Sequence, residues 1–243
     1  MDRMDTMDTM DTVDLMDADV VRPRGRGGDE VKPKRYIVVE GPIGAGKTSL
    51  AKLLAEEFQA RLILEKVDEN PFLKRFYEDH EKFAFQTQLF FLLTRYRQQI
   101  ELAQQDLFQQ NAVVDYLFAK DLLFAERNLD ADSMALYRQL FTMLNARLPK
   151  PDLVVYLQAR VDVLLQRIKK RAMDYERHIA PEYVEGIAEA YRNYFFHYDE
   201  TPLLVVNCSE IDFVENSEDT RDLIREIREM GQGVQHYIPL GSR

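Results

Sequence analysis

The sequence lacks the features of a secreted, membrane-spanning or nucleic-acid-binding protein. Its single cysteine, Cys208, excludes an internal disulfide framework and suits a reducing compartment. No stretch approaches the roughly 18 apolar residues of a membrane span, and the N-terminus lacks the apolar core of a signal peptide. The formal charge of -10 argues against a sequence-independent grip on DNA or RNA. We therefore expect a cytoplasmic protein that acts on a small molecule.

The 243 residues fit one α/β domain with tails. Residues 1–34 consist of Met-Asp-Thr triplets followed by arginines that alternate with proline and glycine, and such a stretch cannot bury enough apolar surface to fold. We predict a disordered N-terminal tail over 1–34, a catalytic domain over 35–232 and a C-terminal tail over 233–243. The N-terminal tail fits a functional segment and an upstream start codon equally well, and we assign it no role.

From residue 35 onwards, apolar strands alternate with helical patterns. Strands are predicted at 36–40, 62–64, 112–115, 152–157 and 203–206, and helices separate them, including a long one over about 81–110. Five apolar strands separated by helices predict an α/β fold: a five-stranded parallel sheet with helices on both faces.

The loop between the first strand and the first helix carries the most specific motif. Gly41-Pro-Ile-Gly-Ala-Gly46-Lys47-Thr48 matches G-x-x-x-x-G-K-[ST], in which backbone N–H groups surround phosphates, the lysine reaches the β and γ phosphates and the hydroxyl binds Mg²⁺. A glycine turn without a ligand is the competing interpretation, but the flanking strand and helix favour the P-loop. We predict a P-loop NTPase-type fold that uses ATP and Mg²⁺. The predicted nucleotide-binding residues are Gly41, Pro42, Ile43, Gly44, Ala45, Gly46, Lys47, Thr48 and Ser49.

Two acidic residues stand at the carboxyl ends of predicted strands and would face the same crevice, because ligands bind at this edge in open α/β sheets. Glu65 could accept a proton from an acceptor hydroxyl, although a solvated loop residue is an equally good interpretation. Asp115 could hold the metal together with Thr48, and a structural turn cap is the alternative.

Polar residues on two predicted helices could complete the site. Gln88 and Arg95 are seven positions apart on the long helix and share one face, where amide and guanidinium groups could read a nucleobase edge. Arg167 and Arg171 share a face just before the polar stretch 174–178, which is typical of a lid that closes over phosphates. Solvated helix surfaces, or for the arginines a nucleic-acid patch, are the competing interpretations.

Taken in order, these motifs resemble those of the deoxynucleoside kinases, especially the bacterial deoxyadenosine, deoxyguanosine and deoxycytidine kinases, over about residues 35–230. The segment from Glu65 to Phe72, Glu-Lys-Val-Asp-Glu-Asn-Pro-Phe, is similar to the family's Glu-Pro-Val-x-x-Asn-Pro-Tyr/Phe, whose first carboxylate is the base for the 5′-hydroxyl. The resemblance also implies substrate roles elsewhere. Tyr77 and Glu176 are implied to contact the sugar, and Gln88, Arg95 and Asp121 to contact the base.

Two positions depart from the family pattern. The family usually has Glu/Asp-Arg-Ser at the end of the third strand, whereas this chain has Asp115-Tyr116-Leu117. That arginine normally lies beside the acceptor oxygen, so another group must take its role or turnover must suffer. Met173 stands in the lid where a further arginine is common. Lys47 and the lid are the remaining obvious sources of positive charge at the γ-phosphate.

The expected activity is phosphorylation of a deoxynucleoside at its 5′-hydroxyl, with Glu65, Lys47, Arg167 and Arg171 as catalytic residues. The resemblance favours purine deoxynucleosides or deoxycytidine, and implies a homodimer that uses the long helix. Two alternatives stay open. A nucleoside monophosphate kinase, such as thymidylate kinase, would need a cluster that grips the acceptor phosphate, and a degenerate nucleotide-binding regulatory module is suggested by the missing arginine.

Overall fold

The computed structural model describes residues 36–105, 111–173, 176, 179–213 and 215–239. The predicted disordered tail, the last residues of the predicted long helix and most of the predicted lid stretch 174–178 lie outside the described residues. Among the helices that are described, none is long and apolar enough to cross a membrane.

Six parallel strands form a single sheet in the order β2-β3-β1-β4-β5-β6. The strands that were predicted are rich in valine, leucine and isoleucine, and most of their side chains are buried. In the register, Ile37 of the first strand lies beside Val113 on one side and Leu153 on the other. The strands are β1 (Tyr36–Glu40), β2 (Arg61–Ile63), β3 (Ala112–Val114), β4 (Leu153–Gln158), β5 (Leu203–Asn207) and β6 (Val234–Tyr237).

The predicted number of five strands is wrong by one. The additional strand, β6, lies in the segment 233–243 that was interpreted as a C-terminal tail, and it pairs with β5 through Leu203 opposite Val234. The first three side chains of β6 are exposed. A strand at the edge of a sheet with an exposed face needs no apolar run, so hydrophobic periodicity did not reveal it.

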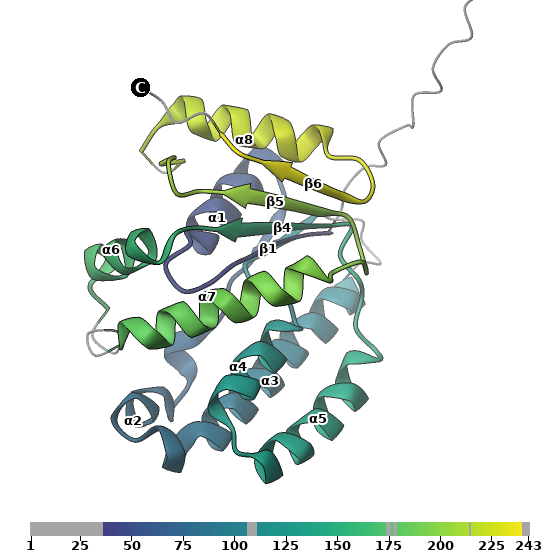
Figure 1. Ribbon diagram of the computed structural model, residues 1–243. Coiled ribbons are helices and arrows are strands. Elements are labelled where there is room, and N and C mark those ends of the chain that lie inside the picture. Colours follow the sequence, from purple (N-terminus) through teal and green to yellow (C-terminus); the bar gives the residue numbers. More distant parts are fainter. Residues whose placement is uncertain (1–35, 106–110, 174–175, 177–178, 214, 240–243) are drawn as a thin grey trace, which may run out of the picture. The chain divides into compact units, whose positions relative to one another are not determined.

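The helices cover both faces of the sheet, as predicted. They are α1 (Lys47–Glu57), α2 (Leu73–Glu78), α3 (His80–Gln105), α4 (Lys120–Asn128), α5 (Ala131–Asn145), α6 (Val161–Arg171), α7 (Pro181–Phe196) and α8 (Ser217–Glu229). Successive strand residues face opposite sides: Val39 packs in one core with residues of α1 and α8, whereas Val38 packs in a second core with residues of α7. Figure 1 shows α3, α4 and α5 side by side, and α3 contacts both of the others.

The parallel arrangement positions the polar residues that follow the strands. β1, β2 and β3 are neighbours and run in the same direction, so Glu40, Glu65 and Asp115 come out at the same edge of the sheet. In open α/β sheets this carboxyl edge is where ligands bind. The fold therefore brings together two of the acidic residues that the sequence singled out, and it adds Glu40 to them.

Candidate active site

The loop between β1 and α1 requires glycine for backbone conformation and for space. Gly46 has a left-handed φ of 98° and immediately precedes Lys47, the first residue of α1. A Cβ at Gly46 would lie 2.8 Å from the Phe213 ring. A Cβ at Gly44, where φ is 84°, would lie 2.7 Å from the Leu164 carbonyl oxygen. The first N–H groups of a helix have no intrahelical partner, so this loop forms an anion site at the α1 N-terminus.

The Lys47 ammonium lies across the loop. Its Nζ donates to the carbonyl oxygens of Gly41 at 2.8 Å and Pro42 at 3.1 Å. Burial and the nearby Lys120 ammonium lower the pKa of Lys47 to about 8. An anionic ligand would stabilise the protonated form, so this lysine is poised to meet a phosphate.

Thr48 and Asp115 form a pair at the start of α1. The Thr48 hydroxyl donates to Asp115 Oδ2 at 2.7 Å, and Asp115 Oδ1 accepts from the backbone N–H of Glu65 at 2.6 Å. A hydroxyl and a carboxylate beside a phosphate loop are the oxygen ligands that Mg²⁺ prefers, and it commonly needs only one or two from the protein. Among the described residues, no cluster of three or more His, Cys, Asp or Glu residues forms a self-contained metal site.

A buried carboxylate that the sequence did not reveal joins the loop to the end of β3. Glu40 is 1% exposed. Its Oε1 accepts from the backbone N–H of Gly41 at 2.8 Å and from the Tyr191 hydroxyl at 3.0 Å, and its Oε2 accepts from the backbone N–H of Leu117 at 2.7 Å. Glu40 therefore fixes the P-loop relative to the segment that follows Asp115.

Glu65 follows β2 and is held by two cations. One carboxylate oxygen pairs with the Arg95 guanidinium, and the other lies 2.6 Å from the Lys120 ammonium. The side chains of Arg95 and Lys120 are 5% and 7% exposed. Burial alone would raise the pKa of Glu65, but the two cations outweigh burial and hold its pKa well below the usual range. The Glu65 carboxylate is therefore ionised.

Arg95 connects Glu65 to a second carboxylate. Its guanidinium also pairs with Asp121 Oδ1, and Asp121 is fully buried. Burial raises the pKa of Asp121, an effect that Arg95 opposes and the charge of Glu65 adds to. Arg95 Nε and Asp121 Oδ2 have no hydrogen-bond partner within the described part of the chain. Asp121 therefore holds the Arg95 guanidinium in place through this ion pair.

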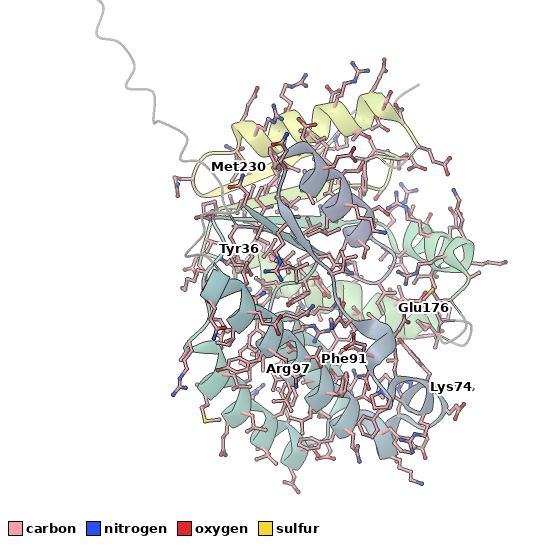
Figure 2. All side chains as sticks on the ribbon, turned by 180° about the vertical axis from the view of Figure 1, so that it is seen from behind. Tyr36, Lys74, Phe91, Arg97, Glu176 and Met230 are labelled. Carbon is pink, nitrogen blue, oxygen red and sulfur yellow. The ribbon has the colours of Figure 1, made fainter. Side chains whose placement is uncertain are left out.

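One cavity of about 590 Å³ contains most of the predicted site residues. Phe91 and Glu176, which are both labelled in Figure 2, contribute to its wall from α3 and from the segment after α6. Aromatic rings give the end near Glu65 apolar surfaces. The predicted residues that line the cavity are Ile43, Gly44, Gly46, Lys47, Thr48, Ser49, Glu65, Tyr77, Gln88, Arg95, Asp115, Arg167, Arg171 and Glu176, whereas Gly41, Pro42, Ala45 and Asp121 lie behind it.

The two predicted lid arginines line the cavity but are bonded to protein groups. Arg167 donates from Nη2 to the carbonyl oxygens of Cys208 at 2.9 Å and Ile211 at 3.0 Å. Arg171 forms a two-point pair with Glu176, and its side chain is 48% exposed. Glu176, for which the resemblance implied a sugar contact, is thus paired with Arg171.

Sequence reasoning missed Lys120 and the aromatic wall. Lys120 lines the cavity as the first residue of α4, five positions after Asp115. A signal was present, because the helix dipole disfavours a lysine in the first turn of a helix, but only the structure shows its distance to Glu65. Phe76, Phe91, Phe124 and Tyr183 were hidden because aromatic residues at helical spacing also form ordinary core.

A phosphate-binding loop at the carboxyl edge of a parallel sheet, with an ionised carboxylate facing it across one cavity, defines a P-loop phosphotransferase. The deoxynucleoside kinase family profile matches residues 37–231. Deoxyguanosine kinase of Bacillus subtilis is 34% identical over 200 residues, which is 80% of this chain and 97% of that protein. Deoxyadenosine kinase of Lactobacillus acidophilus is 32% identical over 211 residues, which is 80% of this chain and 95% of that protein.

A solved structure agrees with the sequence comparison. Deoxyadenosine kinase from M. mycoides with bound dCTP superimposes with a TM-score of 0.68 at 25% identity, covering 79% of this chain and 97% of that one. The chain belongs to the deoxynucleoside kinase family, whose members phosphorylate deoxynucleosides. The predicted P-loop kinase fold and family are confirmed.

Proposed function

We propose that the chain transfers the γ-phosphoryl group of ATP to the 5′-hydroxyl of a deoxynucleoside, and that Glu65 positions this acceptor. The supporting observation is one cavity that is lined both by Lys47 and Thr48 of the P-loop, here called the donor end, and by Glu65 and Gln88, here called the acceptor end. Its volume of about 590 Å³ lies within the usual range of small-molecule sites. Transfer to a neutral hydroxyl needs a group that holds the hydroxyl and takes its proton, and a buried ionised carboxylate facing the phosphate loop can do both.

At the donor end, the loop over residues 41–49 binds the triphosphate through backbone N–H groups, and Lys47 exchanges the Gly41 and Pro42 carbonyls for phosphate oxygens. The Thr48 hydroxyl and the Asp115 carboxylate would hold Mg²⁺, because they already lie 2.7 Å apart beside the loop. When bound, the metal neutralises charge on the β and γ phosphates.

At the acceptor end, Glu65 accepts a hydrogen bond from the 5′-hydroxyl. The new bond forms between the 5′-oxygen and the γ-phosphorus, the bond to the β–γ bridging oxygen breaks, and the hydroxyl proton passes to the Glu65 carboxylate. In a loose transition state the proton moves late, so the main task of Glu65 is orientation. Arg95 and Lys120 keep the carboxylate in the ionised form that this task requires.

The rest of the acceptor fits between α3, α4 and α7. Gln88 and Arg95 bind the edge of the base, and the ion pair with Asp121 fixes the position of Arg95. The Arg95 guanidinium carbon lies 4.8 Å from the centroid of the Phe91 ring, so this ring is beside the base as well. Tyr77 and Glu176 contact the sugar. An amide and a guanidinium are suited to purines and to cytosine, which present paired donors and acceptors.

The helix α6 supplies positive charge from the opposite wall. Arg167 and Arg171 line the cavity close to the P-loop side, and each could exchange its present partners for phosphate oxygens when the segment after α6 closes. Closure would also exclude water from the transferring group. The Arg171–Glu176 pair would then part, which releases Glu176 for the sugar.

The test is an ATP-consumption assay with the four deoxynucleosides and, separately, with their monophosphates. The proposal expects turnover with at least one deoxynucleoside and a 5′-monophosphate as product. Turnover of monophosphates only would indicate a thymidylate-kinase-like enzyme. ATP binding without turnover of any nucleoside would indicate a regulatory module and would overturn the proposal.

We also propose a cytoplasmic homodimer. Leu93 on α3 is 47% exposed, which supports a role for this helix in association. Cys208 is fully buried, and burial raises the pKa of its thiol, so it is an inert core residue of the kind found in reducing compartments. Light scattering on a size-exclusion column, with Leu93→Glu as the variant expected to yield monomer, tests the oligomeric state.

A further inference from the structure

Lys120 is a buried lysine in a position that is locally unfavourable. It is the first residue of α4, where the helix dipole disfavours a cation, and its side chain is 7% exposed. Burial of an ammonium is costly unless the charge is paired. Its Nζ lies 2.6 Å from Glu65 Oε2 and 5.5 Å from the centroid of the Phe124 ring. The contact with Glu65 therefore accounts for the placement of this lysine.

The two cations that pair with Glu65 differ in their other contacts. Arg95 divides its guanidinium between Glu65 and Asp121, and it faces the end of the cavity with Gln88 and Phe91. Lys120 pairs with Glu65 on the oxygen that Arg95 does not bind. A base that accepts hydrogen bonds from Arg95 would weaken the ion pair between Arg95 and Glu65. The ion pair between Lys120 and Glu65 would be unaffected, because it does not involve the base.

Lys120 also lies close to the P-loop lysine. It lines the same cavity as Lys47, and it is near enough for its charge to lower the pKa of Lys47. The charged groups near Glu65 are Arg95 of α3, Lys120 of α4 and Lys47 of α1, together with Asp115, which accepts from the Glu65 backbone N–H, and Asp121, which pairs with Arg95. Tyr116, which occupies the position after Asp115, is fully buried and donates to Gln98, so it supplies no charge there.

We propose that Lys120 is the positioning residue of the acceptor site: its ion pair with Glu65 Oε2 orients the Glu65 carboxylate towards the acceptor hydroxyl. This inference rests on the proposed function. Lys120 takes no part in the proton transfer, because the proton of the 5′-hydroxyl goes to Glu65 and the leaving group is ADP. It supplies, from a different element, the positive charge that is missing at position 116.

The decisive experiment compares Lys120→Met and Lys120→Arg with wild type, and uses Lys52→Met, an exposed lysine on α1, as the control for lost charge. We expect Lys120→Met to lower kcat by about 10²-fold, with KM for ATP within about threefold of wild type. Lys120→Arg should recover most of the rate, because it keeps the positive charge beside Glu65.

A double variant keeps the proposal testable if Lys120→Met folds poorly. Glu65→Gln/Lys120→Met removes both charges of the pair and leaves no uncompensated ion. Because Lys120 acts through Glu65, adding Lys120→Met to Glu65→Gln should cost less than about threefold in kcat. A further loss as large as in the wild-type background would overturn the proposal, and so would a kcat of Lys120→Met within about twofold of wild type. Absence of deoxynucleoside phosphorylation by wild type would instead overturn the proposed function.

Discussion

The two ends of the cavity are built differently. At the donor end, residues 41–49 are contiguous, and Lys47 is held by backbone carbonyls five and six positions away. At the acceptor end, the partners of Glu65 are 30 and 55 positions away, and Arg95 reaches Asp121 across 26 positions. The donor end is therefore specified by local sequence, whereas the acceptor end exists only when three elements have packed together.

The electrostatics of the two ends differ in the same way. At the donor end, Lys47 bonds to backbone carbonyls, and burial together with the charge of Lys120 lowers its pKa to about 8 although Glu40, Glu65 and Asp115 oppose this shift. The acceptor end holds two carboxylates and two cations in a buried network, with Arg95 Nε and Asp121 Oδ2 unpaired among the described residues. Breaking one member of such a network leaves an uncompensated charge, so its residues are coupled. Substitutions at the acceptor end should consequently be non-additive.

The largest effect is expected from Glu65→Gln, which tests whether the acceptor end can be changed without affecting ATP binding at the donor end. It should lower kcat by at least about 10²-fold, because an amide cannot take the hydroxyl proton and no longer attracts Lys120. ATP affinity should stay near wild type, because Glu65 is not part of the loop. Steady-state kinetics and ATP titration calorimetry measure the two quantities.

A matched control for this substitution is Glu69→Gln, which neutralises an exposed glutamate near the same strand end. It should leave kcat within about twofold of wild type, because exposed ion pairs contribute little. Near-normal turnover by Glu65→Gln would show that Glu65 is misassigned. A parallel loss of ATP affinity would show that the two ends are not separate.

The second effect concerns Glu40, which joins the two ends. Glu40→Gln replaces one buried acceptor oxygen by a donor NH₂, which faces the N–H groups of Gly41 or Leu117. We expect a loss of about 2 kcal/mol in the free energy of unfolding, roughly thirtyfold in the folding constant. Urea denaturation measures it. Tyr191→Phe, which removes only the hydroxyl at 3.0 Å, should cost about half as much, and equal stability of Glu40→Gln and wild type would remove Glu40 from this role.

How far the sequence predicts this molecule follows from the same contrast between local and distant contacts. The P-loop, β1 and α1 were predictable because glycine spacing and apolar periodicity are local signals. Glu65 and Asp115 were found from their place after strands, but β6 was missed because its exposed side chains give no apolar pattern. Lys120 and Glu40 were missed because their partners lie far along the chain. No periodicity encodes such distances.

A smaller effect tests whether Asp121 acts through Arg95. Asp121→Ala should change the ratios of kcat/KM among the four deoxynucleosides by about tenfold, and with them the ranking of the bases. The rate on the best pyrimidine should change by less than these ratios do. The reason is that Arg95 loses the carboxylate that fixes it, and Asp121 itself does not line the cavity. Competition assays with mixed nucleosides measure the ranking. Glu126→Gln, an exposed position on the same helix, is the control, and an unchanged ranking in Asp121→Ala would remove Asp121 from base recognition.

The smallest expected effect is the uptake of a fraction of a proton by Lys47 when ATP binds. Because the pKa of Lys47 is lowered to about 8, part of this lysine is neutral at pH 8.5 in the free protein. Bound triphosphate favours the ammonium and raises the pKa, so ATP binding should take up protons at pH 8.5 and much less from this group at pH 6.5. Calorimetry in buffers of different ionisation enthalpy measures the uptake. Lys47→Arg, which stays charged, should abolish it, and equal uptake by wild type and Lys47→Arg would assign the proton to another group.

Lys120→Met should reduce the uptake, because removing the neighbouring charge lets Lys47 hold its own proton before the ligand arrives.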